Sequence, residues 1–327
     1  MAEAIRLGLI GCGGNMRGAH VPRIRAEEDV KLVCVADPVM EQARLLMDRY
    51  GGEVAHYEDY RRMVQEEALD AIFISSPHSM HFEQARCGLE AGLHVLVEKP
   101  LTVSSRHTRA LIDLATEKER FLQVSYQRNY FAPHVYAREL VRKGHIGELR
   151  GVVSYVTQNW GRVKGWRLDP ELSGGGMFMD TGSHLVASTL WITGLAPVEV
   201  SALMDCDGKA VDVNAVLNVR FEGGALGTIS TFGNAIEHDE RIAIHGAEGS
   251  IVFHLYKWHV KAVLVNDEPM TIPDRIRETT PDAAFFDWIR SGGKGYEAPD
   301  FALQVARLSE AAYRSLESKT PVTVETH

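Results

Sequence analysis

The first 126 residues alternate short apolar runs with amphipathic segments. The apolar runs are rich in β-branched residues and lack polar alternation, as expected of strands that helices cover on both faces. These runs are 4–10, 30–36, 70–75, 94–98 and 121–126. Helical periodicity fills the intervening segments 40–50, 79–91 and 104–119. The alternation predicts βαβ units and a parallel sheet.

From about residue 149 the pattern changes to longer runs in which apolar and polar residues alternate. Turn signals such as EGG and AEGS separate runs 149–160, 197–205, 213–221, 225–232, 241–246 and 249–256. Such runs predict an open, mainly antiparallel sheet. Helical patterns follow the first run and fill 181–193, 281–291 and 299–318. We therefore predict an α/β domain over 1–126 and an α+β domain over 127–327.

Composition narrows the class of protein. The 327 residues are 45% hydrophobic and 24% charged, and no apolar run approaches the length of a spanning helix. The net charge of −9 without a basic block argues against a nucleic-acid partner. The four cysteines show no CxxC spacing, so neither a zinc site nor a disulfide framework is indicated. The start of the chain lacks a signal peptide pattern, which favours the cytoplasm.

A glycine-rich turn follows the first predicted strand. Gly11, Gly13 and Gly14, followed by Asn15, allow a tight turn and close approach of the backbone to a pyrophosphate. Strict G-x-G-x-x-G spacing would place a third glycine where Met16 stands. A plain strand-to-helix turn is the alternative for this motif taken alone.

Asp37 closes the second predicted strand, where a carboxylate can accept hydrogen bonds from the adenosine ribose and repel a 2′-phosphate. A turn or cap with Pro38 is its alternative role. Together with the glycine turn, Asp37 predicts a dinucleotide site in the first domain. NAD is favoured, and Arg17 and Arg44 keep NADP open.

A charged tripeptide, Glu98-Lys99-Pro100, follows the apolar run 94–98. It is preceded by the turn Ser76-Pro77-His78 with His81, and by a helix that ends in Ala91-Gly92. In this order, these motifs resemble those of the Gfo/Idh/MocA oxidoreductases, which include glucose-fructose oxidoreductase and inositol dehydrogenase. The resemblance continues through 123–152, 166–194, 223–230 and 244–251, so it spans nearly the whole chain.

The resemblance implies a Rossmann domain that binds a nicotinamide dinucleotide and a second domain for substrate binding and oligomerisation. The residues expected to bind the cofactor are Gly11, Gly13, Gly14, Asn15, Met16, Asp37, Ser75, Ser76, Pro77, His78, His81, Glu98, Lys99, Gln127, Trp166 and Arg167. Those expected to contact substrate are Lys99, Arg128, Trp160, Asp180, His184 and His238. Two residues depart from the family pattern. Met16 stands at the position of the third glycine, and Ala187 stands where many relatives have an aspartate.

The same resemblance implies that Lys99, Asp180 and His184 are catalytic. Asp180 and His184 are four residues apart, so on a helix they share a face. The run Gly174–Gly176 before them allows a close approach where side chains would obstruct. We expect His184 to accept the substrate proton, Lys99 to stabilise the alkoxide or relay its proton, and Asp180 to orient both hydroxyl and imidazole.

Alternative roles remain open for several of these residues. Asp180 could cap its helix and His184 could pack in the core. Gln127 and Arg128 could be ordinary polar residues at a strand end, the tryptophans could be core residues, and His238 could lie in a surface loop.

The sequence thus predicts an NAD(P)-dependent oxidoreductase acting on a secondary alcohol of a sugar, inositol or related polyol, without a metal or membrane partner. An NAD-dependent glycosidase that oxidises its substrate transiently, and a non-catalytic dinucleotide-binding sensor, are the alternatives. The open sheet predicts a homodimer or homotetramer.

Overall fold

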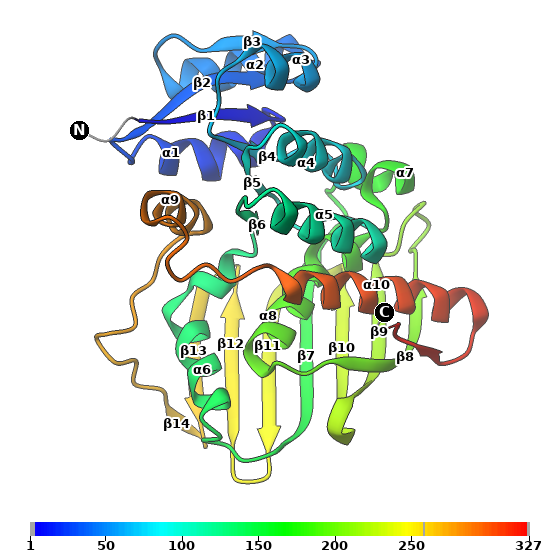
Figure 1. Ribbon diagram of the computed structural model, residues 1–327. Helices are drawn as coiled ribbons and strands as arrows, with labels where there is room; N and C mark the ends of the chain where they lie inside the picture. The colour runs from blue at the N-terminus through cyan, green and yellow to red at the C-terminus, as the bar shows by residue number, and fades with distance from the viewer. Residues whose placement is uncertain (1–3, 258, 326–327) are drawn as a thin grey trace. The chain divides into compact units, whose positions relative to one another are not determined.

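The computed structural model describes residues 4–257 and 259–325 and divides into two compact units (Figure 1). The first unit contains the chain up to Thr102 together with Arg106–Ser125 and Thr280–Asp300. The second contains Val103–Ser105, Tyr126–Thr279 and the chain from Phe301 onward. The sequence analysis placed all of 127–327 in the second domain, whereas Thr280–Asp300 packs in the first unit. No helix within 4–257 or 259–325 has the length and apolar character needed to cross a membrane.

The first unit is built on a six-stranded parallel sheet with the strand order β3-β2-β1-β4-β5-β6. This confirms the expected Rossmann domain with its parallel sheet, because the strand order is that of a Rossmann sheet. The strands are β1 (Ile5–Ile10), β2 (Val30–Ala36), β3 (Ala55–Tyr57), β4 (Ala71–Ile74), β5 (His94–Val97) and β6 (Leu122–Val124). The three-residue β3 carries too few apolar positions for a recognisable pattern, and the sequence analysis missed it.

Helices cover both faces of this sheet. A π-helical turn, η1 (Met16–His20), leads into α1 (Val21–Ile24). The longer helices are α2 (Met40–Tyr50), α3 (Tyr60–Glu66), α4 (His81–Glu90), α5 (Ser105–Glu117) and α9 (Pro281–Ser291). A short 3₁₀ turn, His78–Met80, precedes α4. The predicted helices over 40–50, 79–91, 104–119 and 281–291 therefore form at nearly those bounds.

The helix α9 joins the first unit through aromatic packing. Phe73 of β4 lies with its ring centroid 5.4 Å from that of Phe285 and 5.3 Å from that of Phe286, and all three side chains are fully buried. Gln123 of β6 donates a hydrogen bond of 3.0 Å to the carbonyl of Pro281. Burial of the two phenylalanines stabilises this packing by several kcal/mol, on the order of 2 each.

The second unit contains a nine-stranded sheet with the order β14-β13-β12-β11-β7-β10-β9-β8-β15. Its pairs are antiparallel except for β7 with β10, so the predicted open, mainly antiparallel sheet is confirmed. The strands are β7 (Leu149–Asn159), β8 (Pro197–Asp205), β9 (Asn214–Phe221), β10 (Leu226–Phe232), β11 (Asn234–Gly246), β12 (Ser250–Tyr256), β13 (His259–Val265), β14 (Glu268–Pro269) and β15 (Val322–Thr323).

One face of this sheet is covered by helix α8 (Ser183–Thr193), which contacts β7, β11 and helix α6 (Ala132–Arg142). Ser154 of β7 and Thr189 of α8 share a hydrogen bond of 3.0 Å in this layer. Further helices of the unit include α7 (Pro170–Ser173), the π-helical turn η5 (Phe178–Gly182) and α10 (Asp300–Ser318). On the opposite face, Val153 and Leu226 are about half exposed, at 47% and 54%.

Candidate active site

The glycine turn lies where β1 and β4 part, at the topological switch point of the first unit. Gly11 has a φ of +83°, and a Cβ there would approach the Ser75 carbonyl oxygen to 2.7 Å, so only glycine fits. Among the described residues, no atom apart from those of the adjoining stretch of the same chain lies within 4 Å of the position that a Cβ would take on Gly13 or Gly14. The turn is therefore tight at its first glycine and open at the next two.

Met16 replaces the third glycine of the motif, and its side chain is fully buried in the hydrophobic core of the first unit. The π-helical turn η1 interrupts the helix that follows the glycine turn, ahead of α1. Asn15 precedes η1 and its side-chain amide lies 3.4 Å from the Ser75 hydroxyl oxygen. Met16 thus serves packing beneath the turn, while Asn15 lies at the edge between β1 and β4.

Asp37 stands directly after β2 and is 9% exposed. Its carboxylate accepts hydrogen bonds of 2.8 Å from the backbone N–H of Cys12 and of Val39. Arg17 reaches the same corner and donates to the Cys12 carbonyl and to the Gln42 side chain, at 2.5 and 2.6 Å. Asp37 is therefore held at the rim of the glycine turn.

Arg44 lies on the exposed surface of α2 and pairs with Glu41 on the same helix at 3.0 Å. Of the two arginines that kept NADP open, Arg17 is the one whose hydrogen bonds place it beside the glycine turn.

The turn after β4 carries Ser75, Ser76 and Pro77. The Ser76 hydroxyl donates a hydrogen bond of 2.6 Å to Gln84. His81 is fully buried, with one ring nitrogen 3.0 Å from the Ser76 carbonyl and the other 2.8 Å from the Pro100 carbonyl. His81 therefore ties the turn after β4 to the turn after β5.

His78 is also buried, and its ring meets the His81 ring edge-on at 5.9 Å. His78 of the Ser-Pro-His motif and the following His81 thus form an aromatic pair. Burial lowers the pKa of His81.

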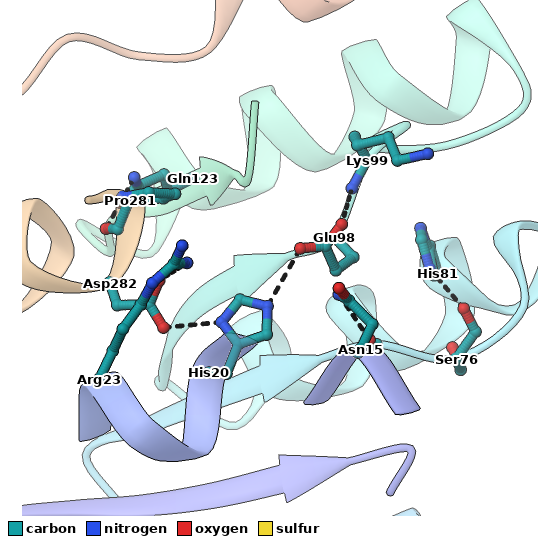
Figure 2. A network of polar contacts seen from close by, with 11 residues as sticks. Asn15, His20, Arg23, Ser76, His81, Glu98, Lys99, Gln123, Pro281 and Asp282 are labelled. Carbon is teal, nitrogen blue, oxygen red and sulfur yellow. Dashed lines mark hydrogen bonds and ion pairs between the residues drawn. The ribbon is translucent and has the colours of Figure 1, made fainter. Parts of the chain in front are cut away.

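Glu98 and Lys99 follow β5 at the same edge of the sheet. One oxygen of Glu98 lies 3.0 Å from His20, and the other accepts the backbone N–H of Lys99 at 3.2 Å (Figure 2). Burial favours the neutral form of Glu98, but the hydrogen bond and charge of His20 and the charge of Lys99 lower the pKa of Glu98 to about 2. Glu98 is therefore ionised, and it holds the backbone of the lysine turn, the segment Glu98-Lys99-Pro100 that follows β5.

These residues fit a nicotinamide dinucleotide. The turn is open above Gly13 and Gly14, a helix begins there, and Asp37 stands at the end of β2. Lys99 lies at the same carboxyl-terminal edge of the sheet. No group of three or more histidine, cysteine, aspartate or glutamate side chains within the described ranges could hold a metal ion.

In the second unit, Asp180 lies in the π-helical turn η5 and His184 in the first turn of α8. A carboxylate oxygen of Asp180 pairs with Arg167 at 2.9 Å. The Arg167 guanidinium lies 4.4 Å from the centre of the Trp166 ring, so the aromatic face supports it. The ring of His184 meets that of Tyr126 edge-on at 5.9 Å. Of the two residues expected near the cofactor, Arg167 thus contacts Asp180, and Trp166 contacts Arg167.

The glycine run before Asp180 packs against the protein itself. A Cβ on Gly176 would lie 1.9 Å from the carbonyl oxygen of Asp212, and one on Gly174 would lie 2.5 Å from the Val103 side chain. The Asp212 carboxylate accepts the backbone N–H of Gly176 and of Phe178 at 2.7 and 2.8 Å. The close approach expected of these glycines is therefore made to Asp212 and Val103.

Arg128 is buried in the second unit and forms a bidentate ion pair with Glu240, one bond of which is 2.7 Å long. Gln127 begins the same 3₁₀ turn, Gln127–Tyr130. Trp160 is 3% exposed, and its backbone N–H donates to the Gly233 carbonyl at 2.6 Å. The guanidinium of Arg128 and the indole of Trp160 are thus held inside the second unit.

His238 borders a cavity of about 740 Å³ in the second unit, with Gln158, Arg162 and Tyr256 among the other lining residues. Within the described part of the chain, its Nε2 atom has no hydrogen-bond partner. Gln158 donates a hydrogen bond of 2.8 Å to Thr181, the residue after Asp180. This contact joins the cavity that His238 lines to the turn that carries Asp180.

Several polar residues at these sites were missed by the sequence analysis. His20 and Asp282 connect to Glu98, and Asp212 and Tyr313 hold the glycine run. His20 lies only four residues after Met16, the last residue of the glycine turn that was expected to bind the cofactor. This closeness in sequence could have indicated that His20 lies near the site. Asp282 and Asp212 are brought in by tertiary packing, and the sequence carries no local signal for them.

Two family models match the chain. The model of an oxidoreductase family with an NAD-binding Rossmann fold matches residues 5–126, and the GFO/IDH/MocA C-terminal domain matches residues 134–252. The chain therefore belongs to the Gfo/Idh/MocA family of NAD-binding oxidoreductases, as the sequence motifs predicted.

Three relatives illustrate the similarity. D-glucoside 3-dehydrogenase of Escherichia coli is 28% identical over 61% of this chain and 56% of its own length. Myo-inositol 2-dehydrogenase of Thermotoga maritima is 28% identical over 76% of this chain and 74% of its own length. The structure of GenD2 from gentamicin A biosynthesis in complex with NAD is 25% identical, with a TM-score of 0.85 over 100% of this chain and 98% of that chain.

Proposed function

We propose that this oxidoreductase transfers a hydride between NAD and a secondary alcohol carbon of a sugar, inositol or related polyol. The observation that carries the proposal is the position of Lys99 at the sheet edge that also presents the glycine turn and Asp37. A cation at that edge is suited to hold a reacting hydroxyl beside a nicotinamide. NAD, when bound, accepts or donates the hydride.

The proton chemistry falls to three side chains. Lys99 binds the hydroxyl and stabilises the developing alkoxide, and His184 accepts the proton, since imidazole exchanges protons near neutral pH. Asp180 orients the hydroxyl, and its ion pair with Arg167 supports its ionised form. We propose that Lys99, Asp180 and His184 act on the same substrate.

For the remaining residues we propose supporting roles. The cofactor contacts the glycine turn, Asp37 and the turns after β4 and β5, and Gln127, Trp166 and Arg167 complete its site. Arg128 and Trp160 shape the substrate side from within the second unit. His238 contacts substrate from its cavity, whose volume of about 740 Å³ suits a small-molecule ligand.

The substrate class is supported by the relatives, whose names refer to a glucoside and to myo-inositol. Direct dehydrogenation differs from redox-assisted hydrolysis in that free NADH is released. Direct dehydrogenation is tested by incubating the protein with NAD or NADP and a panel of sugars, inositols and glycosides. The absorbance of the reduced nicotinamide is followed. Reduction with at least one ring alcohol supports the proposal, and hydrolysis of a glycoside without net reduction contradicts it.

We further propose that the protein is a cytoplasmic homo-oligomer assembled through its second sheet. The half-exposed side chains of Val153 and Leu226 line a groove of about 480 Å³ on the uncovered face, which a second copy would bury. The free cysteines, of which Cys12 and Cys34 are buried, suit a reducing compartment. Light scattering tests the assembly, and a monomer at micromolar concentration would contradict it.

A further inference from the structure

A chain of buried charged side chains leads from helix α9 to the lysine turn. Asp282 and His20 are each 1% exposed, and the Glu98 side chain is 16% exposed. Asp282 lies 2.7 Å from Nδ1 of His20, whose Nε2 lies 3.0 Å from Glu98 (Figure 2). The second oxygen of Asp282 accepts a hydrogen bond of 2.9 Å from Arg23. Glu98 then accepts the backbone N–H of Lys99.

The geometry fixes the charge of His20. Each of its ring nitrogens faces a carboxylate oxygen, and an ionised carboxylate can only accept a hydrogen bond. Both nitrogens therefore donate, which requires the imidazolium form. Burial alone would lower the pKa of His20, but the charge of Asp282 and hydrogen bonds to Asp282 and Glu98 raise it to about 10.

The network ends on the backbone of the lysine turn. Glu98 holds the N–H of Lys99, and His81 lies 2.8 Å from the carbonyl oxygen of Pro100. The N–H of Lys99 and the carbonyl of Pro100, the next residue, are thus each held by a side chain. A buried ionic network often contributes little to net stability, because apolar residues of similar volume commonly stabilise a fold equally well. Stability alone therefore does not account for this network, and its contact with the lysine turn points to a role in positioning.

We propose that Asp282, acting through His20 and Glu98, is a positioning residue for Lys99. The inference rests on the proposed role of Lys99 in proton chemistry. Asp282 keeps His20 protonated, and the imidazolium in turn holds the Glu98 carboxylate where it fixes the lysine turn. The segment Thr280–Asp300, which packs in the first unit, supplies this carboxylate.

The test compares Asp282→Asn and His20→Gln with the unaltered protein in the full chain. Asp282→Asn keeps the shape but removes the charge, so we expect kcat to fall about tenfold or more at pH 8, because small misplacements of reacting groups are costly. The KM for the polyol and the NAD dissociation constant should stay within about threefold. Near-normal kcat in Asp282→Asn at pH 8 would overturn the inference.

The pH dependence separates positioning from a general loss of structure. In Asp282→Asn, His20 still protonates at low pH under the influence of Glu98, so the kcat ratio to the unaltered protein should be higher at pH 6 than at pH 8.5. The groups that bear on His20 are Asp282 of α9 and Glu98 after β5, with Arg23 and Lys99 beyond them. In His20→Gln the loss should not vary with pH. A loss in Asp282→Asn that does not vary with pH overturns the inference.

Arg290→Gln supplies the matched control on the same helix. Arg290 pairs with Glu27 at 2.6 Å and with Asp29 and Asp287, all apart from the Asp282 network. We expect this variant to lower the thermal midpoint and leave kcat unchanged. An equal loss of kcat in Arg290→Gln would mean that loosening α9 is sufficient, and would overturn the inference.

Two further arms keep the result interpretable. If Asp282→Asn does not fold, His20→Gln decides, and normal kcat in it overturns the inference. Lys99→Met distinguishes the two proposals, because normal turnover in that variant defeats the proposed function itself. If Lys99→Met is inactive while Asp282→Asn and His20→Gln are normal, only the positioning role fails.

Discussion

The hydroxyl of Tyr313 donates a hydrogen bond of 2.7 Å to Asp212, which also accepts the N–H groups of Gly176 and Phe178. Burial and the charge of Asp212 raise the pKa of Tyr313 well above its ordinary value, so the hydroxyl remains a donor. This buried carboxylate thereby fixes the backbone immediately before Asp180. The local geometry of the proposed proton site is set by a contact between α10 and the segment that precedes β9.

The glycine run should tolerate no side chain where it meets Asp212. A methyl group on Gly176 would lie 1.9 Å from the Asp212 carbonyl oxygen, so Gly176→Ala must displace backbone. We expect a loss of about 3 kcal/mol in the free energy of unfolding, measured by chemical denaturation. Gly18→Ala is the control, because no described atom beyond its own stretch of helix lies within 4 Å of its Cβ position, and it should not lower stability. Equal stability of the two variants would contradict this account.

The fold was largely predictable because its pattern is local. Continuous apolar runs predicted the parallel strands, and alternating runs predicted the second sheet, in which buried residues alternate with more exposed ones along β7 and β10. The parallel pairing of β7 with β10 was not predictable, since it joins strands that are distant in sequence. The return of α9 to the first unit depends on Phe285 and Phe286 finding Phe73, a tertiary contact without a local signal.

Acid should destabilise the second unit through His134. This residue is fully buried against Phe253, and within the described ranges neither ring nitrogen has a hydrogen-bond partner. Burial and the charge of Arg128 lower the pKa of His134 to about 3. The unfolded chain binds a proton below about pH 6.5 while the folded chain does not, so stability falls as the pH drops from 6.5 toward 3.

Replacing His134 by Phe removes that proton uptake. At pH 5 the native histidine costs about 2 kcal/mol relative to pH 7, and His134→Phe should lack this difference. Urea denaturation of both proteins at pH 7 and pH 5 measures it. The same pH sensitivity in both proteins would show that His134 is not responsible.

Arg167 should hold Asp180, the aspartate to which we assign substrate orientation, in place through their ion pair. Arg167→Gln removes the cation 2.9 Å from Asp180, and we expect kcat/KM to fall about tenfold with little change in NAD affinity. Arg167→Lys should recover part of the loss, since it keeps the charge but not the planar guanidinium. Steady-state kinetics and NAD titration separate the effects. A large loss of NAD affinity with unchanged kcat would instead assign Arg167 to the cofactor.

Asp37 should set the preference for NAD over NADP. Asp37→Asn keeps a hydrogen-bond acceptor for Cys12 or Val39 but removes the negative charge that repels a 2′-phosphate. With Arg17 close by, the ratio of NADP to NAD affinity should rise about tenfold or more. Fluorescence titration with both dinucleotides measures the ratio. An unchanged ratio would remove Asp37 from the ribose site.

Residues of the candidate site could be predicted where they directly follow a strand. They could not be predicted where their position depends on tertiary contacts between distant segments. Lys99 and Asp37 could be placed from the sequence because each comes directly after an apolar run. Arg128 could not, because its partner Glu240 lies on a strand more than one hundred residues later. The π-helical turns that carry Met16 and Asp180 were also hidden, since their sequences read as ordinary helix starts.

Lys99→Met tests the central claim most directly, with turnover measured by reduced nicotinamide absorbance and NAD binding measured by titration. Lys118→Met, which changes an exposed lysine of the first unit, is the matched control and should behave as the unaltered protein. We predict that Lys99→Met lowers kcat by about 10²-fold or more while the NAD dissociation constant stays within about threefold. Near-normal turnover of Lys99→Met would contradict the account.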